Sequence, residues 1–119
     1  MGFGWALTEN MLHGVDGAIA MGIGWALTEN MVHGADGAIL NPSLRNYRIP
    51  AFADVPPSEV FFADTYDRIG PLGAKSQGEC AINAVAPAVA NALANATGVR
   101  FAHLPFTPDR IFDKLVLAK

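Results

Sequence analysis

Apolar and polar residues recur at helical spacing in residues 84–97, and this stretch predicts a helix. Val85, Val89 and Leu93 fall on one side of it among several alanines, whereas asparagines lie four residues apart on another side. Gly98 follows as a residue type that commonly ends helices. The stretch carries no charge, but the asparagines disfavour a membrane span. We therefore expect a soluble helix packed closely on a neighbour.

Local signals mark where two helices begin. Asn83 is placed to cap the helix that follows, which would put Pro87 in its first turn, where a missing N–H costs little. Residues 107–109 read Thr-Pro-Asp, a capping threonine followed by a first-position proline and an acid in the first turn. This pattern predicts a second helix that runs to about Leu115.

Two further segments are predicted as strands. Residues 59–65, Glu-Val-Phe-Phe-Ala-Asp-Thr, are rich in aromatic and β-branched side chains, and residues 99–104 follow the glycine stop as another strand. Residues 41–58 are irregular and rich in proline, and residues 66–79 form a glycine-rich loop. Because helices and strands mix without regular alternation, the predicted class is α+β, with short helices packed on a small mixed sheet.

The chain begins with a tandem duplication. Residues 1–20 and 21–40 are the same twenty-residue sequence except at four positions, where one apolar residue replaces another. Two copies are too few for a solenoid, and one place in a fold is hard to fill twice. We therefore interpret residues 1–20 as a duplicated extra copy and residues 21–119 as the domain proper.

Each copy predicts a short helix followed by a hairpin. In the second copy the helix covers residues 24–31, and Gly34 can stop it because glycine tolerates left-handed backbone angles. Asp36-Gly37 is a strong signal for a two-residue hairpin turn before residues 38–40.

Composition narrows the classes of function. Hydrophobic residues make up 51% of the 119 residues and charged residues only 16%, which suggests a chain that belongs inside something larger. The net charge is −3 and no basic cluster exists, so neither nucleic acid nor a membrane is expected as a partner. The N-terminus lacks the pattern of a secretory signal. The single cysteine, Cys80, excludes an internal disulfide, and we expect a cytoplasmic location without excluding the periplasm.

The segment 73–80, Gly-Ala-Lys-Ser-Gln-Gly-Glu-Cys, carries the strongest candidate chemistry. Its glycines and small residues let backbone N–H groups approach a ligand, and Lys75 and the helix start beyond it favour an anion. Glu79 precedes a long uncharged run, and a carboxylate held against apolar surroundings can serve as a general base. The plainer alternative is a solvated loop with a surface glutamate.

Other reactive residue types have structural alternatives. Cys80, at the predicted helix start, is a candidate nucleophile or simply a small buried thiol. His13 with Asp16, and His33 with Asp36, are ligand types for metals, but each pair lies beside a predicted turn and also fits a structural role. We expect no side chain of this chain to coordinate a metal directly.

Ordered motifs indicate a family resemblance. Residues 22–29 read Gly-Ile-Gly-Trp-Ala-Leu-Thr-Glu, residues 41–50 Asn-Pro-Ser-Leu-Arg-Asn-Tyr-Arg-Ile-Pro, residues 70–79 Gly-Pro-Leu-Gly-Ala-Lys-Ser-Gln-Gly-Glu and residues 104–111 Leu-Pro-Phe-Thr-Pro-Asp-Arg-Ile. Over about residues 21–115 the chain closely resembles the C-terminal end of the molybdenum-binding subunit of the xanthine dehydrogenase/aldehyde oxidase family. It is identified as a terminal piece of the larger molybdopterin-binding domain.

The resemblance implies a molybdenum hydroxylase, an oxidoreductase whose molybdenum is held by a pyranopterin, either molybdopterin or its cytosine dinucleotide form. Glu79 matches the glutamate that closes the family motif and acts as general base while an aldehyde or an N-heterocycle such as a purine is hydroxylated with oxygen from water. Electrons then leave through 2Fe-2S clusters and FAD on partner domains or subunits. The cofactor-binding residues implied by the motif are Gly73, Ala74, Lys75, Ser76, Gln77 and Gly78.

The chain also departs from the family pattern. Cys80 stands where the family often has proline, and Met21 stands where many members have glutamine. The duplication is not a family feature, and catalytic subunits of the family are several times longer. We therefore expect the 119-residue chain alone to be inactive and to need the remainder of its subunit. The alternative function is a non-catalytic remnant or partner-binding module without a cofactor.

Overall fold

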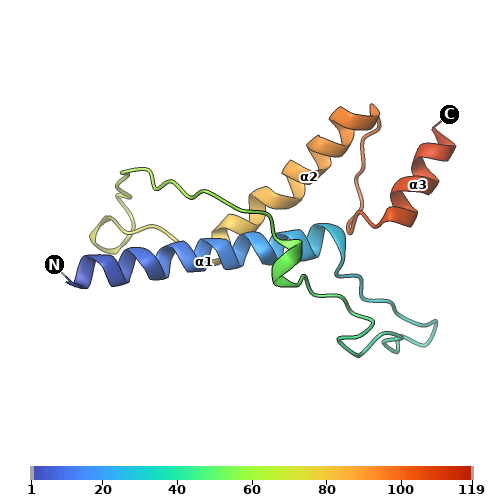
Figure 1. The fold of residues 1–119 in the computed structure, drawn as a ribbon, viewed down its shortest axis with the longest axis horizontal. Helices are drawn as coiled ribbons and strands as arrows, with labels where there is room; N and C mark the ends of the chain where they lie inside the picture. Colours follow the sequence, from blue (N-terminus) through green and yellow to red (C-terminus); the bar gives the residue numbers. More distant parts are fainter. Residues whose placement is uncertain (1, 119) are drawn as a thin grey trace.

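A computed structural model describes residues 2–118, with side chains described from residue 13 onward. Helices joined by long irregular segments make up this structure (Figure 1). Within the described residues, no helix combines the length and the apolar character that crossing a bilayer requires. The elements are α1 (Gly2–Leu27), η1 (Phe52–Asp54), η2 (Pro71–Gly73), η3 (Glu79–Ala81), α2 (Ile82–Thr97) and α3 (Pro108–Leu117), where η denotes a short 3-10 helix.

The mixed sheet expected from the sequence is not present among residues 2–118. Residues 59–65 and 99–104 are irregular, and the only β pairing in the described chain is an isolated antiparallel bridge between His33 and Ile39. A strand is stable only when a neighbour completes its backbone hydrogen bonds, and neither segment makes such bonds here. The helical part of the α+β prediction is therefore confirmed, whereas both strand predictions are wrong for this chain.

Helices α1 and α2 pack closely against one another. Gly22 of α1 is buried, and a Cβ atom there would lie 2.6 Å from the Cβ of Val85 in α2, closer than carbon atoms approach. Ala18 and Ala26, one turn to either side of Gly22, are also buried. The missing side chain at Gly22 thus lets the two helices meet, and the expected packing of residues 84–97 on a neighbour is confirmed.

The beginning of α2 differs from the prediction. The short helix η3 runs directly into α2, so the N-cap residue is Ala81 and Asn83 lies inside the helix. Pro87 is consequently an interior residue, and its ring nitrogen gives no hydrogen bond to the carbonyl of Asn83. Asn83 does not cap because the chain before it is already helical.

Other helix ends follow their local signals. Gly98 ends α2 with a φ of 75°, and its N–H donates to the Ala94 carbonyl at 2.8 Å, as predicted. Thr107 is the N-cap of α3 and Pro108 its first residue, which confirms the predicted start, although the Thr107 side chain makes no capping hydrogen bond. α3 continues to Leu117, slightly beyond the expected end.

The two copies of the duplicated sequence adopt different structures. α1 runs through the first copy and ends at Leu27, inside the second copy and before the expected stop at Gly34. Residues 16–17 are helical, whereas the identical residues 36–37 lie in a turn, in which Gly37 has a φ of 81°. The N–H of Gly34 donates to the carbonyl of Ala38 at 2.8 Å across this turn. The position of the hairpin is confirmed for the second copy, where residues 35–37 form the connection and an isolated bridge closes it, but the expected two-residue turn is not formed, and the prediction is wrong for the first copy.

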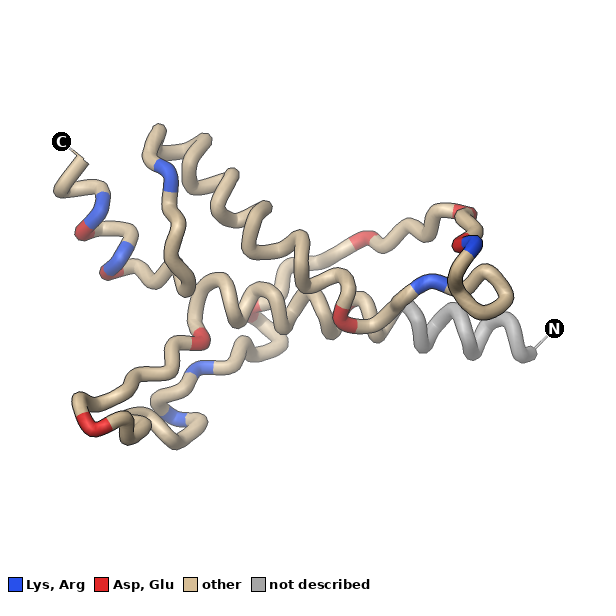
Figure 2. The backbone as a smooth tube through the Cα atoms, turned by 180° about the vertical axis from the view of Figure 1, so that it is seen from behind, with Lys and Arg blue, Asp and Glu red and all other residues tan. Residues whose placement is uncertain are grey.

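The chain is extended and has a very small core. Its radius of gyration is 18.2 Å, against about 13.5 Å for a compact domain of this length. Its accessible surface is 9371 Å², against about 6,200 Å² for a compact monomer of this mass. The buried hydrophobic residues in the described part are Ala18, Ala26 and Phe106. α2 carries no charged residue at all, and the charges lie mainly on the loops and on α3 (Figure 2).

Candidate functional site

The candidate loop leaves η2 and enters α2 through η3. Gly73 at its start is buried and has a φ of 80°, a conformation that favours glycine. The ring of Tyr66 occupies the place that a side chain at this position would need. The N–H of Asp67 donates to the carbonyl of Gly73 at 3.1 Å. These contacts fix where the loop begins.

The middle of the loop is open. Lys75, Ser76 and Gln77 are exposed, and the backbone N–H groups of Lys75 and Ser76 donate no hydrogen bond to another backbone group within the described chain. Gly78 has φ 93° and ψ −108°, and nothing lies within 4 Å of the position where its Cβ would be. The segment therefore offers unbonded amides and one ammonium group beside free space, a set of donors that suits an anion.

Glu79 is the first residue of η3, directly before α2. The helix that follows is held against α1, so the backbone at Glu79 has a defined position. Its side chain is exposed. The apolar enclosure expected from the uncharged sequence after Glu79 is not provided by the described residues, because α2 directs its half-buried residues toward α1.

The candidate loop rests on the helical part of the first copy. Gly14 faces Gln77 so closely that a Cβ on Gly14 would lie 2.8 Å from the Gln77 amide nitrogen. Two residues further along α1, the Asp16 carboxylate accepts a hydrogen bond of 2.7 Å from the Ser58 hydroxyl. Gly14 of the first copy thus lies against the loop, and Asp16 joins α1 to residue 58 outside it.

The remaining candidate residues show no catalytic or metal-binding arrangement. Cys80 is exposed rather than buried, and its thiol lies 3.6 Å from the Ser76 carbonyl. Asp36 accepts a hydrogen bond from the Ala38 N–H at 3.1 Å, which is a turn-forming role. No group of three or more His, Cys, Asp or Glu side chains is placed to hold a metal ion within the described residues.

A polar clasp at the end of α1 was not predicted from the sequence. The Tyr47 hydroxyl donates to the Glu29 carboxylate at 2.6 Å, and Glu29 folds back over Gly24, where a Cβ would collide with it. The hydrogen bond to Glu29, followed by partial burial and the negative charge of Glu29, raises the pKa of Tyr47. Asn41 adds a second link, since its amide donates to the Asn30 carbonyl at 2.7 Å. The clasp joins α1 to the segment after the hairpin.

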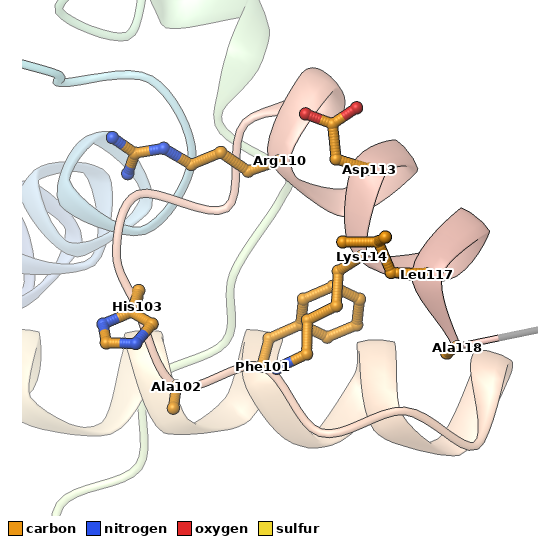
Figure 3. Close-up of a pocket in the computed structure, with 8 residues that line it drawn as sticks. All are labelled: Phe101, Ala102, His103, Arg110, Asp113, Lys114, Leu117 and Ala118. Carbon is orange, nitrogen blue, oxygen red and sulfur yellow. The ribbon is translucent and has the colours of Figure 1, made fainter.

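A pocket lies elsewhere, between residues 101–103 and α3 (Figure 3). It has a volume of about 610 Å³ and is open to solvent. Two of the residues that line it are in contact: the Lys114 ammonium lies over the Phe101 ring, 5.4 Å from the ring centre. None of the residues that line it belongs to the candidate loop, so this hollow is separate from the predicted chemistry.

Comparisons with known proteins find that the chain is similar to parts of molybdenum enzymes. Residues 12–56 match the model of a molybdopterin cofactor-binding domain. The putative xanthine dehydrogenase molybdenum-binding subunit XdhA of Escherichia coli K12 is 41% identical over 118 residues, which are 99% of this chain and 13% of XdhA. The aldehyde oxidoreductase molybdenum-binding subunit PaoC of the same organism is 43% identical over 77 residues, 64% of this chain and 10% of PaoC.

A solved structure shares the fold. Quinoline 2-oxidoreductase from Pseudomonas putida 86 matches with a TM-score of 0.78 and 30% sequence identity, over 87% of this chain and 14% of that protein's chain. The chain therefore spans only 10% to 14% of the lengths of these proteins. These matches confirm the resemblance that the ordered motifs indicate.

Proposed function

We propose, from its relation to the molybdenum-binding subunits of xanthine dehydrogenase and aldehyde oxidoreductase, that this chain forms one wall of a molybdenum hydroxylase site. In this proposal residues 73–78 contact the cofactor and Glu79 is the general base. The observation that carries it is the open loop: unbonded backbone amides and a cationic side chain directly precede a carboxylate at the start of a packed helix.

The donor set fits an anionic pterin cofactor. The amides of Lys75 and Ser76 are available, the Lys75 side chain adds a positive charge, and the space beside Gly78 is free. A side chain at residue 78 would be strained at its φ of 93° and would narrow this space. When bound, the molybdenum cofactor supplies the redox chemistry of the hydroxylation.

Glu79 supplies the acid–base chemistry in this scheme. Its carboxylate accepts a proton during the attack of a water-derived oxygen on the substrate carbon, and η3 and α2 hold its backbone in place. Because this chain leaves the carboxylate exposed, the apolar surroundings that make it an effective base come from the rest of the subunit. The substrate class is an aldehyde or an N-heterocycle such as a purine.

Electron transfer needs further partners. We assign the 2Fe-2S clusters and FAD to other domains or subunits, as the resemblance to the xanthine dehydrogenase/aldehyde oxidase family implies. We also propose a cytoplasmic enzyme whose pterin is molybdopterin or its cytosine dinucleotide form.

A chimera of XdhA tests the role of Glu79. The 118 matched residues of XdhA are replaced by this chain, and Glu79→Gln is compared with Asp113→Asn, which also converts an exposed carboxylate to an amide. We expect Glu79→Gln to lower turnover by about 10²–10⁴-fold while molybdenum content stays constant, since the loss of a general base has this size. Asp113→Asn should leave both unchanged. Turnover of Glu79→Gln within threefold of the parent would remove Glu79 from the reaction.

The non-catalytic alternative is favoured by one observation, the large exposed apolar surface, which a partner-binding module would also have. Metal analysis separates the two functions. Stoichiometric molybdenum in the purified chimera supports the cofactor-binding role. A folded chimera without molybdenum supports the alternative.

A further inference from the structure

Residues 59–65 have the composition of a strand but no strand to pair with. Val60, Phe61 and Phe62 favour extended, pleated backbone. Residues 56–66 nevertheless make no backbone hydrogen bond within the described chain, and Phe61 is 86% exposed. Natural proteins cover or interrupt an apolar edge of this kind, because its free N–H and C=O groups pair with other chains.

Both ends of the segment are tied to the rest of the chain. On the N-terminal side, the Ser58 hydroxyl donates to Asp16 of α1 at 2.7 Å. On the C-terminal side, the Tyr66 ring lies against Gly73, and the Asp67 N–H donates to the Gly73 carbonyl at 3.1 Å. Between these contacts the chain forms an arch that stands away from α1 (Figure 1). The segment is therefore held at both ends, and its middle is exposed to the surroundings.

We propose that residues 59–65 add as a β-strand to a sheet edge in the remainder of the molybdenum-binding subunit, and that this pairing restrains the loop 73–79. The inference rests on the proposed function. Strand addition uses main-chain hydrogen bonds for affinity and alternate side chains for specificity, and both are available in this segment. Gly73 is both the C-terminal anchor of the segment and the first residue of the candidate loop. Pairing of residues 59–65 therefore limits the movement of the loop.

The length of the related proteins bears on which polypeptide pairs with this segment. The same backbone arrangement occurs within quinoline 2-oxidoreductase, whose chain is about seven times longer than the matched part, and XdhA exceeds its matched part by a similar factor. A fold embedded in a chain of that length has polypeptide available to cover its open edges. This favours the remainder of the subunit over a second copy of the chain.

Hydrogen exchange tests the pairing directly. Amides 60–64 are followed in the 119-residue chain at low concentration and in the XdhA chimera described above. We expect them to exchange nearly unprotected in the free chain and about a hundredfold more slowly in the chimera, because amides of a paired strand are released only by local opening. Protection in the free chain that rises with its own concentration would instead indicate pairing between two copies and would overturn the proposal.

Proline substitutions identify the paired edge. Neighbouring N–H groups of a strand point to opposite edges, so the amides of Phe61 and Phe62 face different sides. We expect either Phe61→Pro or Phe62→Pro to lower the thermal midpoint of the chimera well below that of the alanine variant at the same position, which keeps the N–H. If each proline variant has the same thermal midpoint as the alanine variant at its position, no strand is paired there and the proposal fails.

None of these measurements requires the cofactor, so they are independent of the proposed reaction. Full turnover in Glu79→Gln would refute the general base and leave the pairing intact, whereas unprotected amides in an active chimera would refute only the pairing. If the chimera does not accumulate as folded protein, hydrogen exchange is measured instead at the positions of unmodified XdhA that align with residues 60–64. Protection there supports the proposal, and its absence overturns it.

Discussion

At the scale of single residues, Glu29 has a role that its motif alone does not reveal. The carboxylate lies over Gly24, which has no side chain to displace it, and accepts the hydrogen bond of Tyr47. The two partners are 18 residues apart, and the hairpin lies between them. The clasp therefore closes a loop, and its hydrogen bond offsets part of the entropic cost of bringing the two ends together.

The pH dependence of Tyr47 tests this clasp. The pKa of Tyr47 is raised above its ordinary value of 10.0, first by its hydrogen bond to Glu29. The folded state thus holds the phenol proton, and the clasp contributes fully below the ordinary pKa and is lost as the pH rises through the raised one. We expect Glu29→Gln to shift the titration of Tyr47 toward lower pH, measured by NMR of labelled tyrosine. An identical titration in both proteins would show that the hydrogen bond is not maintained.

Only part of this residue-level picture could be predicted. The segment 73–79 stands out because its glycines, lysine and glutamate are contiguous. The pairing of Glu29 with Tyr47 depends on how the hairpin folds back, and the support of Gln77 by Gly14 depends on helix α1. Neither contact leaves a local pattern. The exposure of Glu79 agrees with the plainer alternative of a surface glutamate. An uncharged neighbouring sequence does not determine which face of its helix is covered.

At the scale of elements, the duplication shows how context chooses between structures. The same Asp-Gly-Ala-Ile sequence is helical at residues 16–19 and forms a turn and bridge at residues 36–39. Asn41 and Tyr47, which lie just after the second copy, bind the residues of that copy that follow α1. In the first copy, α1 continues and buries Ala18. Tertiary contacts thus outweigh the weak local preferences of this sequence.

Two glycines at equivalent positions of the copies give opposite predictions. Gly17 is inside a helix with open space around it, so Gly17→Ala should stabilise the chain by about 0.5–1 kcal/mol. Gly37 has a φ of 81°, and Gly37→Ala should destabilise it by about 1–2 kcal/mol, the cost of a side chain in the left-handed region. Thermal unfolding followed by circular dichroism measures both. Changes of the same sign would mean that the two copies share one conformation in solution.

The other elements were predicted correctly where their interactions are between residues close in sequence, and wrongly where they need a distant partner. Gly98 ends α2 through its left-handed backbone and a hydrogen bond to Ala94, and α3 begins at Thr107 and Pro108 as predicted from local residue types, so both helix ends are confirmed. Residues 59–65 were predicted as a strand from side-chain type alone, but a strand needs a partner that this chain does not contain in its described part. The composition was informative, and the missing partner made the prediction wrong.

At the scale of the whole molecule, the exposed surface is too large and too apolar for an independent domain. The accessible area of 9371 Å² exceeds that of a compact monomer by about 3,200 Å², more than one side of a standard protein interface contributes. Exposed large side chains include Leu72, Phe52 and Ile69, each at least 96% exposed. A surface of this kind is normally covered by other polypeptide.

The 119-residue chain alone should therefore be inactive and self-associating. Contact between exposed apolar faces removes them from water, and by mass action the associated fraction must rise with concentration. Sedimentation velocity over a hundredfold range of concentration should show a monomer that gives way to larger species, and an assay with aldehydes and purines should show no hydroxylation. The XdhA chimera is the control, because in it the same faces are covered, and its sedimentation should not depend on concentration in this way. A free chain that stays monomeric, binds molybdenum and turns over would mean that its exposed faces need no partner, and the proposed dependence on the rest of the subunit would fall.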